Sequence, residues 1–255
     1  MGENMQIRKS WSSVGCGLIL SLGITQAARG SVIFDDFNLN EGHFTSNPIG
    51  GSGSTNGIVA PSDATRITTE AVEGAGSQQI VLVPTAAGNS MRLRHLSGSG
   101  TPANNTAFTT SAGVDGWIGV YLKTAGSSPA STMTVQIWIE GAPSGNDNGS
   151  VPKTIIADNE WHLYEWNLDD NSGGANGWGA VAGIVAGSPT VADISHTIDS
   201  VLIRSTALNG NATVFMDFVA KSDSGSVATL IPEPATLSLL ALSALPLLAR
   251  RRNRA

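Results

Sequence analysis

The stretch Val214-Phe215-Met216-Asp217-Phe218-Val219 decides the fold class of this chain. Successive residues of a β-strand lie on opposite faces, and here both faces are mostly apolar, which is typical of a central strand covered on both sides. Asp217 is the exception, because a carboxylate inside such a strand needs a partner, either a metal ion or backbone and serine donors. The stretch predicts a central strand of a sheet that is covered on both faces, with the carboxylate of Asp217 as its one charged side chain.

Short runs of alternating apolar residues recur along the chain, separated by Gly, Ser, Asn and Pro, without a long amphipathic helix between them. In one run, Val135, Ile137 and Ile139 share a face and Trp138 lies on the other. About nine strands are expected from such runs: residues 32–37, 79–83, 91–96, 117–123, 134–140, 153–157, 161–168, 198–204 and 213–220. The predicted fold class is all-β, a jelly-roll-like β-sandwich over residues 31–221.

Two polar stretches are expected to be connections rather than parts of the sandwich. Residues 141–150 include Asn146-Asp147-Asn148-Gly149, which is typical of a turn. Residues 222–231 are expected to form a polar spacer that lets the folded domain stand clear of a membrane.

The first 30 residues have the composition of a signal peptide. Arg8 and Lys9 form a basic segment, residues 14–24 are apolar, and small residues follow. We expect signal peptidase to cleave after Ala27.

The last 24 residues begin with Pro232-Glu233-Pro234, continue as an apolar span over 235–249, and end in a basic cluster. The cluster consists of Arg250, Arg251, Arg252 and Arg254. Guanidinium groups resist transfer through hydrocarbon, so such a cluster stays on the cytoplasmic side and orients the span in the inner membrane. The span contains Pro246 and is shorter than the roughly 20 residues of a comfortable transmembrane helix. It suits a temporary anchor better than a permanent one.

Motif, span and arginines together resemble a PEP-CTERM sorting signal, the C-terminal tag that an exosortase reads. The resemblance implies that residues 232–255 are a transmembrane sorting signal, with Pro232, Glu233 and Pro234 as its motif. It also implies that the exosortase removes the span and passes the ectodomain to the cell surface or extracellular matrix.

The exported part is acidic and has no thiol. Residues 31–231 carry seven basic and 18 acidic side chains, a net charge of −11, and the only cysteine, Cys16, lies in the signal peptide. The negative electrostatic potential of such a domain repels the phosphate groups of nucleic acids, so no nucleic-acid partner is expected.

Catalysis is not expected from the residues present. The four histidines are scattered, and no Gly-x-Ser-x-Gly lies between a strand and a helix. Facing carboxylates would be needed for a glycosidase. The candidate pairs are Asp35/Asp36, Glu160/Glu165 and Asp169/Asp170; the first are neighbours on a strand and the last opens a loop.

A structural Ca²⁺ is the only cofactor considered, and none is required. Phe34-Asp35-Asp36-Phe37 and the last strand resemble the first and last strands of galactose-binding-type jelly rolls, in which acids near both chain ends often share one Ca²⁺. The resemblance implies Asp35, Asp36 and Asp217 as candidate ligands, while backbone or serine donors remain an alternative for Asp217.

The tryptophans are the candidates for contact with a glycan, since sugars stack on exposed rings. Residues 158–170, with Trp178 after a Gly-rich loop, resemble a pattern in exported sandwiches that carry the same tag and, more distantly, in carbohydrate-binding jelly rolls. We expect Trp161 and Trp166 to be structural. Trp178, between two glycines, and Trp138 are expected to contact a glycan.

These observations predict an exported, non-catalytic surface or matrix protein that contacts exopolysaccharide. The first alternative is a purely structural protein of the envelope or biofilm without a sugar site. The second is a polysaccharide-active enzyme.

Overall fold

The computed structural model describes most of the residues predicted to form the sandwich. The described residues are 31–39, 44, 57–95, 108–109, 116–125, 133–141, 146–170, 174–178, 195–206, 211–223 and 225–231. The predicted signal peptide with its expected cleavage site at Ala27, the motif at 232–234, the apolar span and the terminal arginines all lie outside them. Within the described ranges, no helix has the length and apolar character needed to cross a bilayer.

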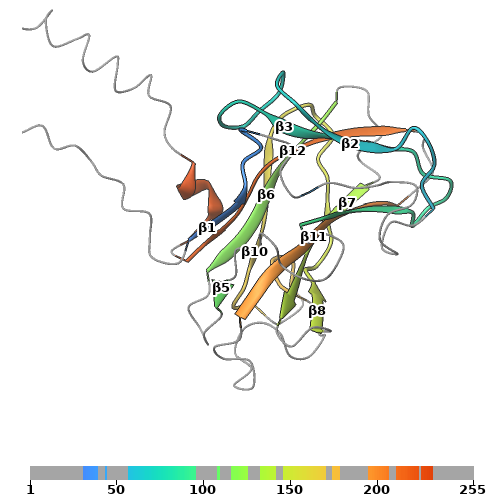
Figure 1. The fold of residues 1–255 in the computed structure, drawn as a ribbon. Helices are drawn as coiled ribbons and strands as arrows, with labels where there is room; N and C mark the ends of the chain where they lie inside the picture. The colour runs from blue at the N-terminus through green and yellow to red at the C-terminus, as the bar shows by residue number, and fades with distance from the viewer. Residues whose placement is uncertain are drawn as a thin grey trace, which may run out of the picture.

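Two antiparallel six-stranded sheets face each other (Figure 1). Sheet A has the order β10-β6-β12-β3-β2, with β1 also paired to β12, and sheet B has the order β4-β11-β7-β8, with β5 on β11 and β9 on β7. The strands of sheet A are β1 (Val32–Asp35), β2 (Asp63–Ile67), β3 (Ser77–Leu82), β6 (Trp117–Thr124), β10 (His162–Asn167) and β12 (Ala212–Ser222). Those of sheet B are β4 (Ser90–Arg94), β5 (Phe108–Thr109), β7 (Met133–Gly141), β8 (Asn146–Gly149), β9 (Lys153–Thr154) and β11 (Ser195–Ser205).

The all-β sandwich predicted from the sequence is confirmed, and each of the nine predicted strands is present. The described residues add β2, β5 and β8 to them. The prediction of a turn at 146–149 is wrong, because these residues form β8 and pair with the end of β7. An unpaired strand edge offers hydrogen bonds to any neighbouring backbone, so even an Asn- and Gly-rich segment is drawn into the sheet.

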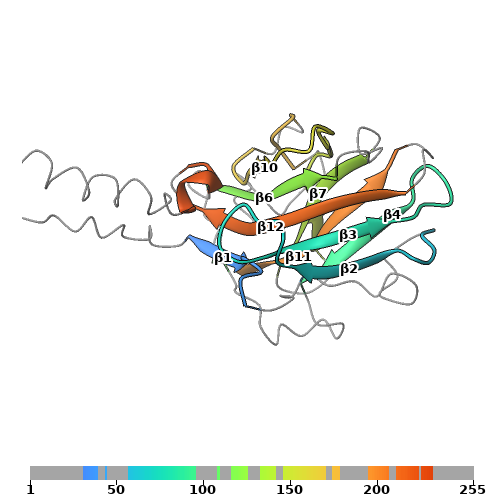
Figure 2. The ribbon, with the colours of Figure 1, turned by 90° about the horizontal axis from the view of Figure 1, so that it is seen from above.

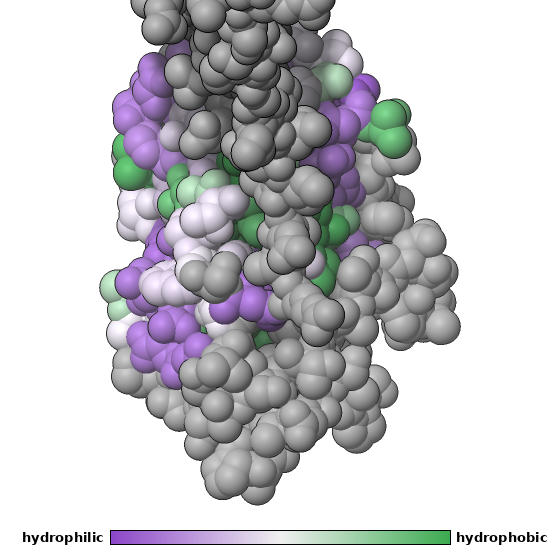
Figure 3. All heavy atoms as spheres, turned by 90° about the vertical axis from the view of Figure 1, so that its left-hand side faces the viewer, coloured by the Kyte–Doolittle hydropathy of each residue, from purple (hydrophilic) through white to green (hydrophobic). Residues whose placement is uncertain are grey.

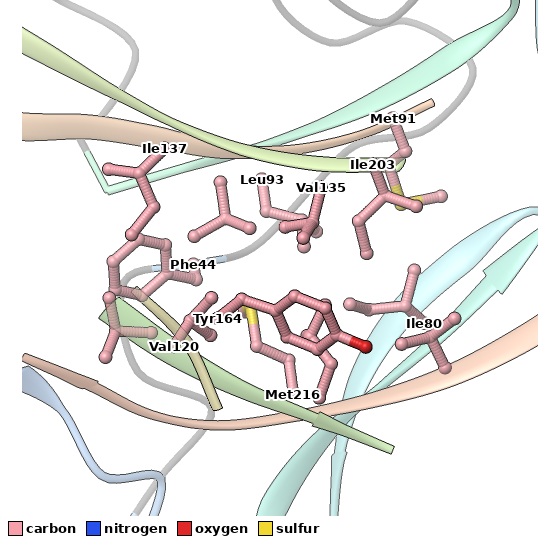
Figure 4. Packing of buried hydrophobic residues seen from close by; sticks show 14 of the residues in the cluster. Phe44, Ile80, Met91, Leu93, Val120, Val135, Ile137, Tyr164, Ile203 and Met216 are labelled. Carbon is pink, nitrogen blue, oxygen red and sulfur yellow. The ribbon is translucent and has the colours of Figure 1, made fainter. Parts of the chain in front are cut away.

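Apolar side chains from the inner faces of the two sheets form the core. Figure 4 shows Ile137, Val135 and Ile203 of sheet B facing Val120 and Met216 of sheet A. All five are at most 1% exposed. This packing follows from the alternation along each strand, which sends one set of apolar side chains inward.

Strand β12 is the central strand of sheet A and is covered on both faces. It pairs with β6 and β3, and near its end with β1. A register shift between Asp217 and Ala220, with Phe218 at φ 48°, turns Phe218 to the outer face. There Phe218 and Ala220 pack with Val227, while Val219 returns to the main core.

The segment predicted as a free spacer packs on the sandwich instead. Residues Val227–Leu230 form a short 3-10 helix, η2, and Val227 is fully buried. Glu165 of β10 accepts hydrogen bonds from Ser226 Oγ and the Val227 amide, both at 2.9 Å. Figure 2 shows η2, in orange-red, beside the ends of β12 and β6. The outer face of sheet A is covered here by the apolar side chains of Val227, Leu230 and Ile231. This part of the segment therefore packs on the domain and does not act as an extended spacer.

The first and the last described residues lie on the same side of the sandwich. Val32 of β1 pairs with Lys221 of β12, and the Asp223 amide donates to Ser31 Oγ at 3.5 Å. Figure 3 looks onto this end and shows hydrophobic atoms in its middle between hydrophilic flanks.

Candidate functional site

Trp178, the first expected glycan contact, is buried. Its side chain is 2% exposed, and its indole N–H donates to the Asn167 carbonyl at 3.1 Å. The chain approaches itself closely here, since a Cβ on Gly177 would lie 2.8 Å from the Asp170 carbonyl oxygen. The expectation of an exposed ring is therefore wrong. Because Gly177 has no side chain, the chain can pass close to Asp170 here, and the indole of Trp178 packs in the core.

Trp166 is structural, as predicted. It is fully buried, and its indole N–H donates to the Val151 carbonyl at 2.7 Å. Lys153 Nζ lies 5.2 Å from the centre of the ring and donates to the Glu165 carbonyl and Asn176 Oδ1, both at 2.7 Å. Trp161, by contrast, is half-buried.

Trp138, the second expected glycan contact, lies on the outer face of sheet B and is half-buried. Its strand neighbours are Ser200 on β11 and Gly149 on β8. A Cβ on Gly149 would come within 2.7 Å of the indole, so only glycine lets the ring lie this close to β8. The guanidinium of Arg92 lies over the ring, 5.1 Å from its centre, which is a cation–π distance.

Asp199 holds the arginines of this face in place. It lies at a register shift in β11, and its side chain is fully buried. Arg94 Nη2 donates to Asp199 Oδ1 at 2.6 Å, and Arg92 Nη2 donates to Asp199 Oδ2. Ser200 Oγ donates to Asp199 Oδ2 at 2.7 Å and accepts from Arg92 Nε at 2.7 Å. A fully buried carboxylate thus binds two partly exposed guanidinium groups. Arg92 is fixed by hydrogen bonds to both Asp199 and Ser200, and Arg94 by one charge-assisted hydrogen bond to Asp199.

Two donors on the same face have no acceptor among the residues that the structure describes. They are the indole N–H of Trp138 and Nε of Arg94, each shielded from solvent. Buried donors are almost always satisfied in folded proteins, so these two mark a point where an oxygen acceptor is required. We call the set Arg92, Arg94, Trp138, Asp199 and Ser200 the sheet-B cluster.

Sequence reasoning missed all of the sheet-B cluster except Trp138. Arg92 and Asp199 are 107 residues apart in the chain, and nothing in either local sequence indicates that they meet. Alternation does place Arg92 and Arg94 opposite the buried Met91 and Leu93, so their outward position was readable.

The three carboxylates expected to bind Ca²⁺ have other partners. Asp35 Oδ1 accepts from the Phe37 amide at 3.0 Å, and Asp36 Oδ1 accepts from the Asn38 amide at 3.1 Å. Asp217 accepts from the amides of Val72 at 2.7 Å, Glu73 at 3.3 Å and its own neighbour Phe218 at 2.7 Å. This is the backbone alternative considered for Asp217.

Burial raises the pKa of Asp217 to about 7, although the amides favour its charged form. A cation beside the carboxylate would act in the opposite direction. Nowhere in the described part of the chain do three Asp, Glu, His or Cys side chains come together to hold a metal ion. The acids present do not fit the shared Ca²⁺ site implied by the resemblance.

In two of the candidate acid pairs, one carboxylate makes a structural contact. Glu165 fastens η2, and Asp169 Oδ2 accepts from the Gly116 amide at 3.3 Å. Glu160 is exposed.

No protein-family model matches the chain, and no characterised protein matches it in sequence. Among solved structures it is similar to a carbohydrate-binding module of the β-sandwich superfamily, at 9% identity and TM-score 0.35, over 70% of this chain and 62% of that one. It is also similar to a β-1,2-glucanase from Parabacteroides distasonis, at 10% identity and TM-score 0.45, over 76% and 25% of the two chains. A third is the family 11 carbohydrate-binding module of cellulase Lic26A-Cel5E from Clostridium thermocellum, at 13% identity and TM-score 0.39, over 77% and 96%.

The chain therefore spans less than two thirds of the first two structures. At these identities and TM-scores, no conclusion about this chain is drawn from the similarities.

Proposed function

We propose that this chain is an exported, non-catalytic protein of the cell surface or extracellular matrix that contacts exopolysaccharide through the sheet-B cluster. The observation that carries the proposal is the half-buried indole of Trp138 beside the guanidinium of Arg92 on the outer face of a sheet. An aromatic ring offers an apolar surface to the C–H groups of a sugar, and planar polar side chains offer hydrogen bonds to its hydroxyls.

The rigidity of the cluster favours binding. Asp199 and Ser200 hold the guanidinium groups before any ligand arrives, so less side-chain entropy is lost on association.

A non-catalytic role is supported by how the acids are used. Glu165, Asp169 and Asp217 accept hydrogen bonds from backbone amides that hold the fold together. Glycoside hydrolysis uses a raised-pKa acid and an ionised partner that both reach the sugar. Asp217 has a raised pKa, but its side chain is fully buried in the sheet, away from any sugar on the surface.

Affinity electrophoresis through gels that contain different polysaccharides tests the binding role. The wild-type full-length chain in mild detergent should be retarded by at least one of them, and Trp138→Ala should weaken the retardation about tenfold, the effect of losing one stacking contact of about 1.4 kcal/mol. Trp161→Ala is the matched control, because it removes another half-buried indole outside the cluster.

The alternatives give different results in the same experiment. If no polysaccharide retards the wild-type chain, the protein is a structural component of the envelope or biofilm without a sugar site. Release of reducing sugar ends during incubation would identify an enzyme.

Sorting by an exosortase belongs to the same proposal. Its support is the sequence: Pro232-Glu233-Pro234 followed by a short apolar span and four arginines. The prolines keep the motif extended for an enzyme's groove, and Glu233 offers one charge beside the membrane. In a host that has the enzyme, intact mass should show loss of the C-terminal span, and Glu233→Ala should leave the full-length chain in the membrane. Retention of residues 235–255 by the wild type would refute the sorting role.

A further inference from the structure

The segment that follows β1 closes one end of the core. Phe37 and Phe44 are fully buried, with ring centres 6.3 Å apart, and Figure 4 shows Phe44 at the edge of the packed side chains. To bring its ring inward, Phe37 adopts φ 53°. A backbone turned this way leaves its carbonyl groups without strand partners, so they need donors from elsewhere.

Arg66 of β2 supplies those donors. Its Nε donates to the Phe37 carbonyl at 2.5 Å, and its Nη2 donates to the Asn38 carbonyl at 2.8 Å and to the Ala75 carbonyl at 3.4 Å. The three oxygens come from two segments, the one after β1 and the loop at 70–76. Arg66 is therefore a link between the N-terminal segment and that loop.

Asn38 reinforces the same link. Its Nδ2 donates to Glu73 Oε1 at 2.8 Å, and its Oδ1 accepts from the Ala75 amide. The Glu73 and Val72 amides in turn donate to Asp217 of β12. Arg66 thus binds the segment after β1 and the loop at 70–76, and the loop in turn is held to the last strand by Asp217.

Carbonyl and carboxamide oxygens from separate segments, gathered around one cation, are also what a structural Ca²⁺ uses. Here the cation at the centre is the guanidinium of Arg66, which directs its donors in a fixed plane. The carboxylates that Ca²⁺ would need are engaged elsewhere: Asp35 and Asp36 cap their own turn, and Asp217 accepts hydrogen bonds from three backbone amides.

We propose that Arg66 takes the place of the metal ion expected at this end of the sandwich. The guanidinium, and no Ca²⁺, ties the segment after β1 to the loop at 70–76, and the folded chain is independent of divalent cations.

Thermal unfolding of the full-length wild-type chain in EDTA and in millimolar Ca²⁺ tests this without any substitution. The Tm should be the same in both. A Tm that falls in EDTA and is restored by Ca²⁺ overturns the proposal, because a metal would then hold this end.

Substitution of the arginine tests the positive half of the proposal. Arg66→Met should lower the Tm by about 5–10 °C, since charge-assisted hydrogen bonds to three carbonyls are lost. Arg66→Lys keeps the charge but lacks the planar donors, so its Tm should lie between those of the wild type and Arg66→Met. Lys123→Met is the matched control, because it removes a partly buried cation that pairs with Glu70 in the same region.

Amide hydrogen exchange locates the effect. In Arg66→Lys, residues 31–39 and 70–76 should exchange faster while β7 and β11 are unchanged. Exchange and Tm equal to wild type in both Arg66 variants would refute the role of Arg66.

Discussion

Asp217→Asn should change how the stability of the protein depends on pH. The folded state raises the pKa of Asp217 from 3.8 to about 7, mainly because the carboxylate is buried. Between these values the folded chain binds a proton that the unfolded chain has released, so the free energy of unfolding falls as pH rises. The contribution is complete below pH 3.8 and is lost by about pH 7.

The size of this effect follows from the pKa difference. Each pKa unit corresponds to about 1.36 kcal/mol, so the full loss is about 4 kcal/mol, of which about 3 kcal/mol falls between pH 4.5 and pH 7.5. Asn carries no charge at either pH. The difference in stability between wild type and Asp217→Asn should therefore change by about 3 kcal/mol over that range, in favour of the variant at higher pH.

Urea unfolding followed by tryptophan fluorescence at several pH values measures this difference. Asp36→Asn controls for the change in net charge, since it removes one acid from the same end of the sandwich. If wild type and Asp217→Asn show parallel pH curves, the reasoning fails. Should the variant not fold, an NMR titration of the Asp217 carboxyl carbon in the wild type decides the matter, and a midpoint near pH 4 would refute the raised pKa.

Three further outcomes follow from the packing. Trp178→Ala should cost about 3–5 kcal/mol in urea unfolding and leave polysaccharide binding by the folded chain unchanged; lost binding at unchanged stability would contradict the burial of this ring. Asp199→Ala should cost about 2–3 kcal/mol in the same assay, because Arg92 and Arg94 lose the carboxylate that they share but remain partly exposed. Val227→Asp should release residues 225–231, seen as amide exchange about tenfold faster there and unchanged exchange in β7.

The strands that could be predicted are those whose side chains alternate between core and outside. In β7 the inward residues are Val135, Ile137 and Ile139, and this pattern alone indicates the strand and places Trp138 on the outer face. Strand β2 lacks such a pattern: it begins with Asp63, and its inward-facing residues are the small Ala64 and the polar Arg66. It is a strand because β3 supplies backbone partners.

The candidate site was only partly predictable for a related reason. The glycines beside Trp178 indicated an exposed ring, but Gly177 instead lets the chain pass close to the Asp170 carbonyl. The Asp199 carboxylate depends on a register shift in β11, and the pairing of Arg92 with it depends on strands that are adjacent only in the folded sheet. Such contacts follow from topology, which local sequence does not contain.

The position of β12 also determines how the protein bears mechanical force. A force applied to the C-terminal end acts first on η2 and then directly on β12. The 11 residues of β12 pair with β6 and β3 and, near the end of the strand, with β1. Inter-strand hydrogen bonds of an antiparallel sheet lie perpendicular to the strands. Sliding β12 out of the sheet would strain the bonds along both of its edges together rather than one after another. The end of the chain for which we propose a sorting signal thus follows the strand best placed to resist extraction.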